Sequence, residues 1–131
     1  IFHMGPNGSG ATMKLAVNAL VHAINVALSE SLVLAEAGDV ERSLAYEVFA
    51  SSAASSPFIQ YKRPAFEQPD ETPVAFSLDL VAKDLRLILG LADRLGVPMA
   101  QGAVNAAAAQ AAIAAGLGGK DMSALAVHLR G

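Results

Sequence analysis

Apolar and polar residues follow one another along this chain with the spacing of helices, and almost nowhere with that of strands. The first predicted helix covers about residues 11–37 and is apolar nearly all round, which is typical of a buried central helix. Gly38 marks its end. Further helices are expected at about 40–50, 77–95, 98–115 and 121–129, with a short helical turn at 56–62. The pattern predicts an all-α fold, a helical bundle around a long central N-terminal helix.

The same pattern predicts which side chains face inward and how the helices begin. In helices 40–50 and 77–95 the inward residues are expected to be Leu44, Val48 and Phe49, and Leu78, Val81, Leu85, Ile88, Leu89 and Leu95. Asn7 or Ser9 can cap the first helix, Asp39 the second and Asp121 the last. Residues 63–73, rich in proline and acidic side chains, are expected to form a surface loop. Residues 1–4 are expected to be the end of a strand whose partner strands are missing.

Composition limits the classes of function. The 131 residues fit one domain, and a net charge of −3 without a basic stripe argues against nucleic-acid binding. There is no cysteine, and the three histidines lack metal-ligand spacing, so no metal site is expected. No apolar stretch is expected to span a membrane. The lack of cysteine and of a targeting segment favours the cytoplasm.

A glycine-rich turn leads into the first helix with the pattern G-x-x-G-x-G-x-x-x-K-x-x-x-N, which ends at Lys14 and Asn18. This spacing is neither the dinucleotide fingerprint nor a phosphate-binding P-loop. Lys14 and Asn18 share one helix face, and the positive helix end favours the neutral form of a lysine. Lys14 can therefore move a proton while Asn18 orients a substrate, and Gly10 allows a ligand to approach closely. The alternative is a surface lysine beside a solvated asparagine.

A second group of residues surrounds the start of helix 77–95. Phe76 and Lys83 are seven residues apart, two helical turns, so they can project from the same side. Phe76 offers an apolar wall and Lys83 a cation for an anionic ligand. The alternative is a core phenylalanine and a solvated Lys83–Asp84 charge pair. His22 is interpreted as a packed or hydrogen-bonded helix residue. The basic side chains Arg42, Lys62 and Arg63 are interpreted as surface charges, although one of them could reach an anion.

Taken together, these segments resemble a known family. They are the glycine-rich turn with Lys14 and Asn18, the stretch SESLVLAEAG at 29–38, Phe76-x6-Lys83-Asp84-Leu85, and GLGGKDMSAL at 116–125. The chain is similar to the C-terminal half of the β-hydroxyacid dehydrogenases. That family includes 3-hydroxyisobutyrate dehydrogenase, tartronate semialdehyde reductase and, more distantly, 6-phosphogluconate dehydrogenase.

The resemblance implies a helical C-terminal domain over residues 1–131 whose partner, an N-terminal Rossmann domain that binds NAD or NADP, is absent from this chain. By the same resemblance Lys14 is the catalytic acid/base. Asn18 and Gly10 bind the substrate, and Lys83 and Phe76 lie near the cofactor. The substrate is expected to be a small 3-hydroxy acid or semialdehyde. The protein is expected to be a homodimer or homotetramer, and the isolated domain is expected to be inactive.

Two other functions fit the same residues. One is a helical oligomerisation module without catalysis of its own, which the alanine-rich segment 98–115 and the apolar first helix would suit equally well. The other is a relative that reduces imines or only binds a ligand. A packing module has no need of Lys14 and Asn18 beside the glycines, so these two residues discriminate between the functions.

Overall fold

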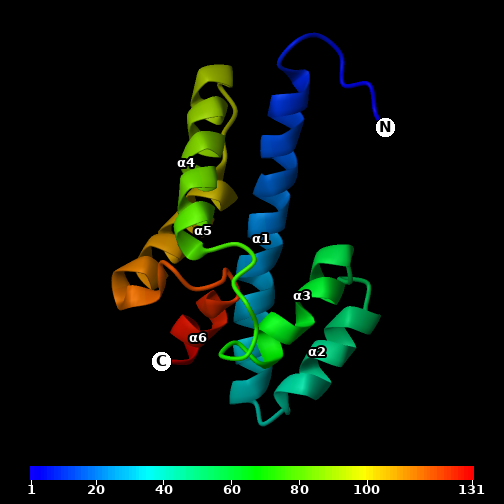
Figure 1. Cartoon of the computed structure of the whole chain (residues 1–131), viewed down its shortest axis with the longest axis vertical. Helices are drawn as coiled ribbons and strands as arrows, with labels where there is room; N and C mark the ends of the chain where they lie inside the picture. Colours follow the sequence, from blue (N-terminus) through cyan, green and yellow to red (C-terminus); the bar gives the residue numbers. More distant parts are fainter.

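One long helix, α1 (Ser9–Ala37), runs the length of the molecule (Figure 1). The computed structural model describes all 131 residues. The elements that follow are α2 (Arg42–Ser51), α3 (Pro57–Glu67), α4 (Leu78–Leu95), α5 (Ala100–Ala112), the π-helical turn η1 (Ile113–Leu117) and α6 (Ala124–Arg130). There is no strand, and the only β-type contact is an isolated bridge between Ser77 and Asp121. The predicted all-α bundle around the first helix is confirmed. Residues 1–4, expected as the end of a strand whose partner strands are missing, are unpaired.

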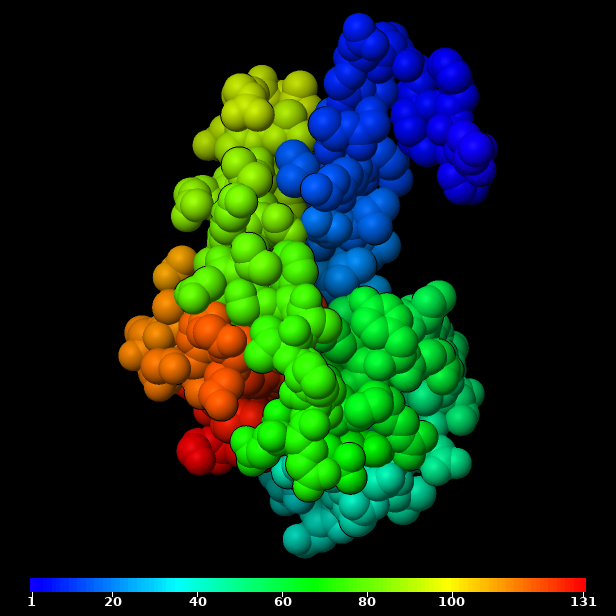
Figure 2. All heavy atoms as spheres, in the orientation of Figure 1, coloured from blue at the N-terminus to red at the C-terminus, as the bar shows by residue number.

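The other helices gather around the two ends of α1. Helices α4 and α5 lie beside its N-terminal part, whereas α2, α3 and α6 surround its C-terminal part (Figure 1). Figure 2 shows the C-terminal part covered by the atoms of α2 and α3, while the blue N-terminal part stands free on one side. We refer to residues 9–20 as the upper half of α1 and to residues 25–37 as its lower half.

The main hydrophobic core lies around the lower half of α1. Its largest fully buried side chains are Leu32, Tyr46, Phe66 and Leu85, from four different helices. The Tyr46 hydroxyl donates a 2.7 Å hydrogen bond to the carbonyl of Ile59, and the Tyr46 and Phe66 rings lie 5.7 Å apart. Burying a side chain of this size contributes about 2 kcal/mol. These contacts fix α2 and α3 against α1.

The predicted inward face of α4 is confirmed except at its end. Leu78, Val81, Leu85 and Ile88 are buried and Leu89 is half-buried, but Leu95 is 62% exposed because it lies at the last turn.

The predicted inward face of α2 is wrong for two of its three residues. Leu44 and Val48 are each 56% exposed, Phe49 packs partly against the core, and Ala45 and Tyr46 are the buried residues. The helix is turned so that its largest ring faces the core and its hydroxyl reaches α3.

The predicted loop 63–73 is wrong in its first part, because α3 continues to Glu67 with Pro64 inside it. The beginning of α3 is as predicted: the Ser56 hydroxyl accepts a hydrogen bond from the Ile59 amide, and Pro57 occupies the first turn. Burial of Ala65 and Phe66 against the bundle outweighs the proline.

Two predicted caps are also wrong. Helix α1 begins after Gly8, whose φ of 94° is left-handed, and neither Asn7 nor Ser9 caps it through a side chain. At the second helix Asp39 takes a φ of 65° and completes the preceding turn. The helix therefore starts later, where the Glu41 carboxylate accepts hydrogen bonds from two amides.

The end of the chain differs in detail from the expected helix 98–115, turn and helix 121–129. Helix α5 stops at Ala112 and widens into η1, where Gly116 has a φ of 90°. Helix α6 begins at Ala124, and Asp121 instead accepts a hydrogen bond from the Ser123 amide in the turn before it.

Helix α1 is, by length and composition, apolar enough to cross a membrane, which corrects the expectation that no stretch of the chain is. Here its lower half forms the centre of the bundle.

Candidate active site

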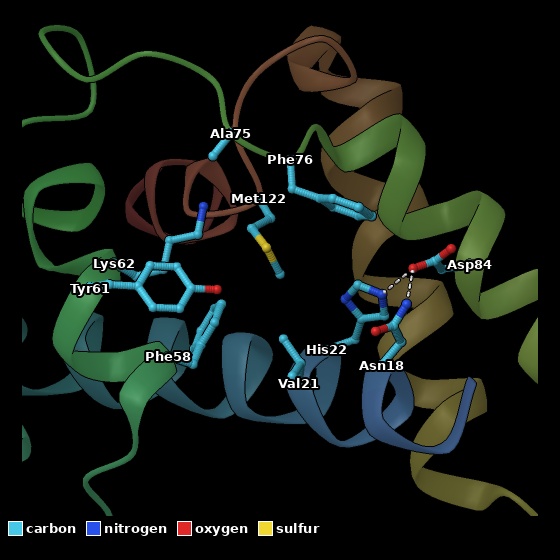
Figure 3. A pocket seen from close by; sticks show the side chains of 10 residues that line it. All are labelled: Asn18, Val21, His22, Phe58, Tyr61, Lys62, Ala75, Phe76, Asp84 and Met122. Carbon is cyan, nitrogen blue, oxygen red and sulfur yellow. Dashed lines mark hydrogen bonds and ion pairs between the residues drawn. The ribbon is translucent and has the colours of Figure 1, made fainter. Parts of the chain in front are cut away.

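An open pocket of about 290 Å³ lies where the upper half of α1 meets the lower group of helices (Figure 3). Its walls come from α1, α3, α4 and the segments just before α4 and α6. The lining residues are Asn18, Val21, His22, Phe58, Tyr61, Lys62, Ala75, Phe76, Asp84 and Met122. Segments far apart in the chain therefore supply one site, which combines apolar walls with a few polar groups, as ligand sites commonly do.

Asp84 joins α4 to α1 through one carboxylate oxygen. Its Oδ2 accepts a 2.9 Å hydrogen bond from the Asn18 amide and lies 3.1 Å from His22 Nε2. A carboxylate can only accept, so Nε2 carries the hydrogen in this contact. Both the histidine and the aspartate are shielded, with side-chain exposures of 3% and 17%. The arrangement holds the Asn18 side chain in one orientation at the pocket wall.

His22 packs against Phe76 and has one ring nitrogen without a partner. The two rings lie 5.8 Å apart and are tilted by 37°. His22 Nδ1 is buried and makes no hydrogen bond. In Figure 3 this nitrogen is on the side of the ring that faces the pocket, opposite the bond to Asp84. The interpretation of His22 as a packed or hydrogen-bonded helix residue is confirmed, and Nδ1 is the one ring nitrogen that stays without a partner.

The far wall of the pocket rests on a buried ion pair. Lys62 Nζ lies 2.8 Å from both carboxylate oxygens of Asp121, and the lysine is 4% exposed. Asp121 Oδ2 also accepts hydrogen bonds from the amides of Ala75 and Phe76, at 3.0 and 3.2 Å. Burial raises the pKa of Asp121, but the hydrogen bonds from Lys62 and the backbone amides outweigh it and hold the pKa below its usual value. The pair therefore anchors the segment that carries Phe76.

The interpretation of Lys62 as a surface charge is wrong, and nothing local in the sequence could have corrected it. Its partner Asp121 lies 59 residues further along the chain. Arg42 and Arg63 are also partly buried: Arg42 bonds to Glu36, and Arg63 to Glu67. The local sequence, with Lys62 between Tyr61 and Arg63, predicts an exposed polar side chain. Only the folded chain places it beside a carboxylate.

The structure brings some of the predicted site residues together and leaves others apart. Asn18 and Phe76 line the same pocket. Lys14 is exposed one turn before Asn18 on α1, and Gly10 is exposed in the first turn with open space around it. Lys83 is exposed on α4 and does not line the pocket. Phe76 precedes the cap residue of α4, so Phe76 and Lys83 are not two turns apart on one helix.

Sequence reasoning missed three polar residues of the pocket, namely His22, Lys62 and Asp84. For Asp84 a signal existed, because it directly follows Lys83 in the segment Phe76-x6-Lys83-Asp84-Leu85. For His22 the signal was its position one turn after Asn18. Lys62 gave no signal.

Comparison with known proteins gives a consistent result. The family model described as "NAD-binding of NADP-dependent 3-hydroxyisobutyrate dehydrogenase" matches residues 8–129. Glyoxylate/succinic semialdehyde reductase 1 of Arabidopsis thaliana is 35% identical over 95% of this chain and 43% of its own length. The 3-sulfolactaldehyde reductase of Escherichia coli is 32% identical over 99% of this chain and 44% of its own length.

The fold is also found in a solved structure. The 3-hydroxyisobutyrate dehydrogenase of Mycobacterium tuberculosis, determined with L-serine, superposes on all of this chain with a TM-score of 0.86 and 25% identity, and the match covers 47% of that protein. The chain thus spans less than half the length of the relatives that it matches.

Proposed function

The chain belongs to the 3-hydroxyisobutyrate dehydrogenase family, and from this premise we propose that it is the helical C-terminal domain of a longer oxidoreductase. Its substrate would be a small 3-hydroxy acid or semialdehyde, and Lys14 would be the general acid/base of the reaction. The observation that supports this most is the fixed orientation of Asn18, whose amide is held by Asp84 at the wall of a pocket that Phe76 also lines. A domain used only for packing has no need of this arrangement.

The cofactor class of the family is NAD or NADP. The exposed residues beside the pocket fit such a molecule, because its phosphates are anionic and its nicotinamide ring is flat. Lys83 would face the negative charge and Phe76 would pack near the ring; both are reachable from solvent, one exposed and the other half-buried. When bound, the cofactor accepts or supplies a hydride. A second domain would hold most of it.

The chain's own residues would then handle the proton and the substrate. Lys14 Nζ would take the hydroxyl proton during oxidation and return it to the oxygen during reduction. Asn18 donates one amide hydrogen to Asp84, which leaves its Oδ1 and second hydrogen for the substrate. Gly10, with no side chain and open space around it, would let the substrate approach the start of α1.

The upper half of α1 also supports a second candidate, an oligomerisation module. Met13, Val17 and Leu20 are 45%, 46% and 63% exposed, and an apolar groove of about 260 Å³ lies between this half and α4. A homodimer or homotetramer is part of both proposals.

An imine-reducing relative would keep Asn18 but could dispense with Lys14. The cytoplasmic location stays a prediction.

Replacement of Lys14 in the full-length protein tests the proposal. We expect Lys14→Ala to lower kcat by about 10²–10⁴-fold, the usual contribution of a general acid/base, with no change in melting temperature because the side chain is exposed. The assay follows reduction of NAD⁺ and NADP⁺ with a panel of small 3-hydroxy acids. Lys120→Ala, another exposed lysine, is the matched control.

Each result decides between the candidates. Near-normal turnover of Lys14→Ala would refute the assignment of the acid/base. A folded full-length protein without turnover on any acid would favour the oligomerisation module, or the imine-reducing relative if it reduces a cyclic imine.

A further inference from the structure

His22 combines two properties that the proposed reaction does not use. It lines the pocket beside Asn18, and its Nδ1 is a buried polar atom without a partner. A buried polar atom that forms no hydrogen bond costs about 1–3 kcal/mol, so such atoms in native proteins call for an explanation. An occupant of the pocket that bonds to Nδ1 would provide one.

The bond to Asp84 sets what Nδ1 can do. When the ring is neutral, Nε2 carries the hydrogen that Asp84 accepts, so Nδ1 presents a lone pair and is an acceptor. Its partner in the pocket must therefore be a donor. The ring cannot turn over without breaking the bond to Asp84 and the contact with Phe76.

The charges around the pocket exclude an anionic occupant at this point. Lys62 is the one cation in the lining, and both oxygens of Asp121 already neutralise it. Asp84, on the other side, adds a negative charge next to His22. A carboxylate or sulfonate placed here would meet an acceptor and a net negative surrounding, whereas a hydroxyl or an ammonium group would be favoured.

The remaining walls leave room for such a group. Val21, Phe58 and Met122 give the pocket an apolar lining, and in Figure 3 the Met122 side chain hangs into it from the turn before α6. A methionine side chain is flexible and adapts to irregular spaces.

We propose that His22 is a substrate-binding residue that accepts a hydrogen bond from a donor-bearing, non-anionic substituent of the substrate. This inference rests on the proposed function, because it assumes that the substrate lies against Asn18. It assigns to the pocket a preference for a hydroxyl or an ammonium substituent over a methyl group of the same size. The ring acts at the same time on Asp84, so it also positions Asn18.

Three compounds of the same shape test the preference. Glycerate, serine and 3-hydroxy-2-methylpropanoate share a carboxylate and a hydroxymethyl group and carry a hydroxyl, an ammonium or a methyl group on the carbon between them. In the full-length protein with ¹⁵N-labelled histidine, the NMR resonance of His22 Nδ1 reports its bonding directly. We expect an unprotonated Nδ1 before addition and a shift with glycerate, serine or both, but not with the methyl compound.

A pair of variants separates the two bonds of the ring. His22→Gln keeps a donor near Asp84 and removes the acceptor, so the ratio of kcat/KM between the donor-bearing and the methyl substrate should fall about fivefold, mainly through KM. His22→Asn places an amide oxygen near the position of Nδ1 and should keep more of that ratio, while kcat falls because Asp84 is released. His128→Gln, on α6 outside the pocket, is the control and should leave the ratio unchanged.

The outcomes are decisive and distinct from those for Lys14. A protonated Nδ1 in the free protein, or a resonance that responds to all three compounds alike or to none, would overturn the role of His22. So would an unchanged ratio in His22→Gln. The NMR measurement needs no turnover, so it decides the role of His22 even if the full-length protein reduces none of the compounds.

Discussion

The two halves of α1 have similar apolar composition but differ in how many of their large apolar side chains are buried. In the lower half Leu28 and Leu32 are 5% and 0% exposed, whereas in the upper half Val17 and Leu20 are 46% and 63% exposed. The lower half is surrounded by α2, α3 and α6 and shares core clusters with α4 and α5, whereas the upper half is flanked only by α4 and α5 (Figure 1). Hydropathy along a helix therefore does not tell which part of it forms the core.

The polar side chains of α1 also differ in burial between the two halves. In the lower half the Asn25 amide donates to the carbonyl of Met122 at 3.0 Å, and the Ser29 hydroxyl donates to the carbonyl of Asn25 at 2.7 Å. Both side chains are buried and serve the packing of the bundle. Lys14, in the upper half, is exposed. The candidate site lies at the boundary, where Asn18 and His22 belong to neither environment entirely.

The largest effect on stability is expected at the lysine of the lower region. Lys62→Met keeps the aliphatic stem but leaves Asp121 buried without its partner, which should cost about 3–5 kcal/mol of unfolding free energy. Lys83→Met, the matched change at an exposed lysine on α4, should stay within about 0.5 kcal/mol. Urea unfolding followed by circular dichroism measures both. Equal losses of unfolding free energy in Lys62→Met and Lys83→Met would show that the buried ion pair of Lys62 does not stabilise the fold.

A smaller effect is expected when one leucine in each half of α1 is shortened. Leu32→Ala creates a cavity in the core and should destabilise the fold by about 2–5 kcal/mol. Leu20→Ala should change stability by about 0.5 kcal/mol or less, because the side chain is already in solvent. The same unfolding experiment applies. A loss above about 1 kcal/mol for Leu20→Ala would show that another part of the protein covers the upper half.

The smallest loss of stability is expected at low pH, and it should come from carboxylates around the lower half of α1. The pKa of Asp121 is held below its usual value, and so is that of Glu36, mainly by the hydrogen bond from Arg130. Because the folded pKa is depressed, these carboxylates add stability above their unfolded pKa values of about 4, and this is lost as the pH falls through the folded values. Unfolding free energies measured from pH 6 to pH 3 should therefore decrease most steeply below about pH 4.

Replacement of the carboxylate isolates its share of this dependence. Asp121→Asn cannot titrate, so its unfolding free energy should start lower at pH 6 and fall less steeply towards pH 3. An unaltered slope in this variant would show that Asp121 does not contribute to the acid sensitivity.

Much of the architecture could be predicted from the chain because it depends on local signals. Gly38 and Gly96 end helices, Ser56 and Ser77 begin them, and the apolar face of α4 repeats with the helical period. Where local signals conflicted with packing, the prediction failed. Pro64 suggested a loop, but burial of Ala65 and Phe66 keeps α3 helical. On α2, one face carries Leu44 and Val48 and another Ala45 and Tyr46, and the contact of Tyr46 with α3 selects the second.

The candidate site divides in the same way. The helical class, the family resemblance and the choice of Asn18 and Phe76 could be predicted from the residues alone, because short-range spacing and motifs carry that information. That Asp84 holds Asn18, that His22 Nδ1 has no partner and that Lys62 is buried became visible only in the folded chain. These contacts join residues about 60 positions apart, and their energies arise from burial and charge pairing, which no local pattern of residues expresses.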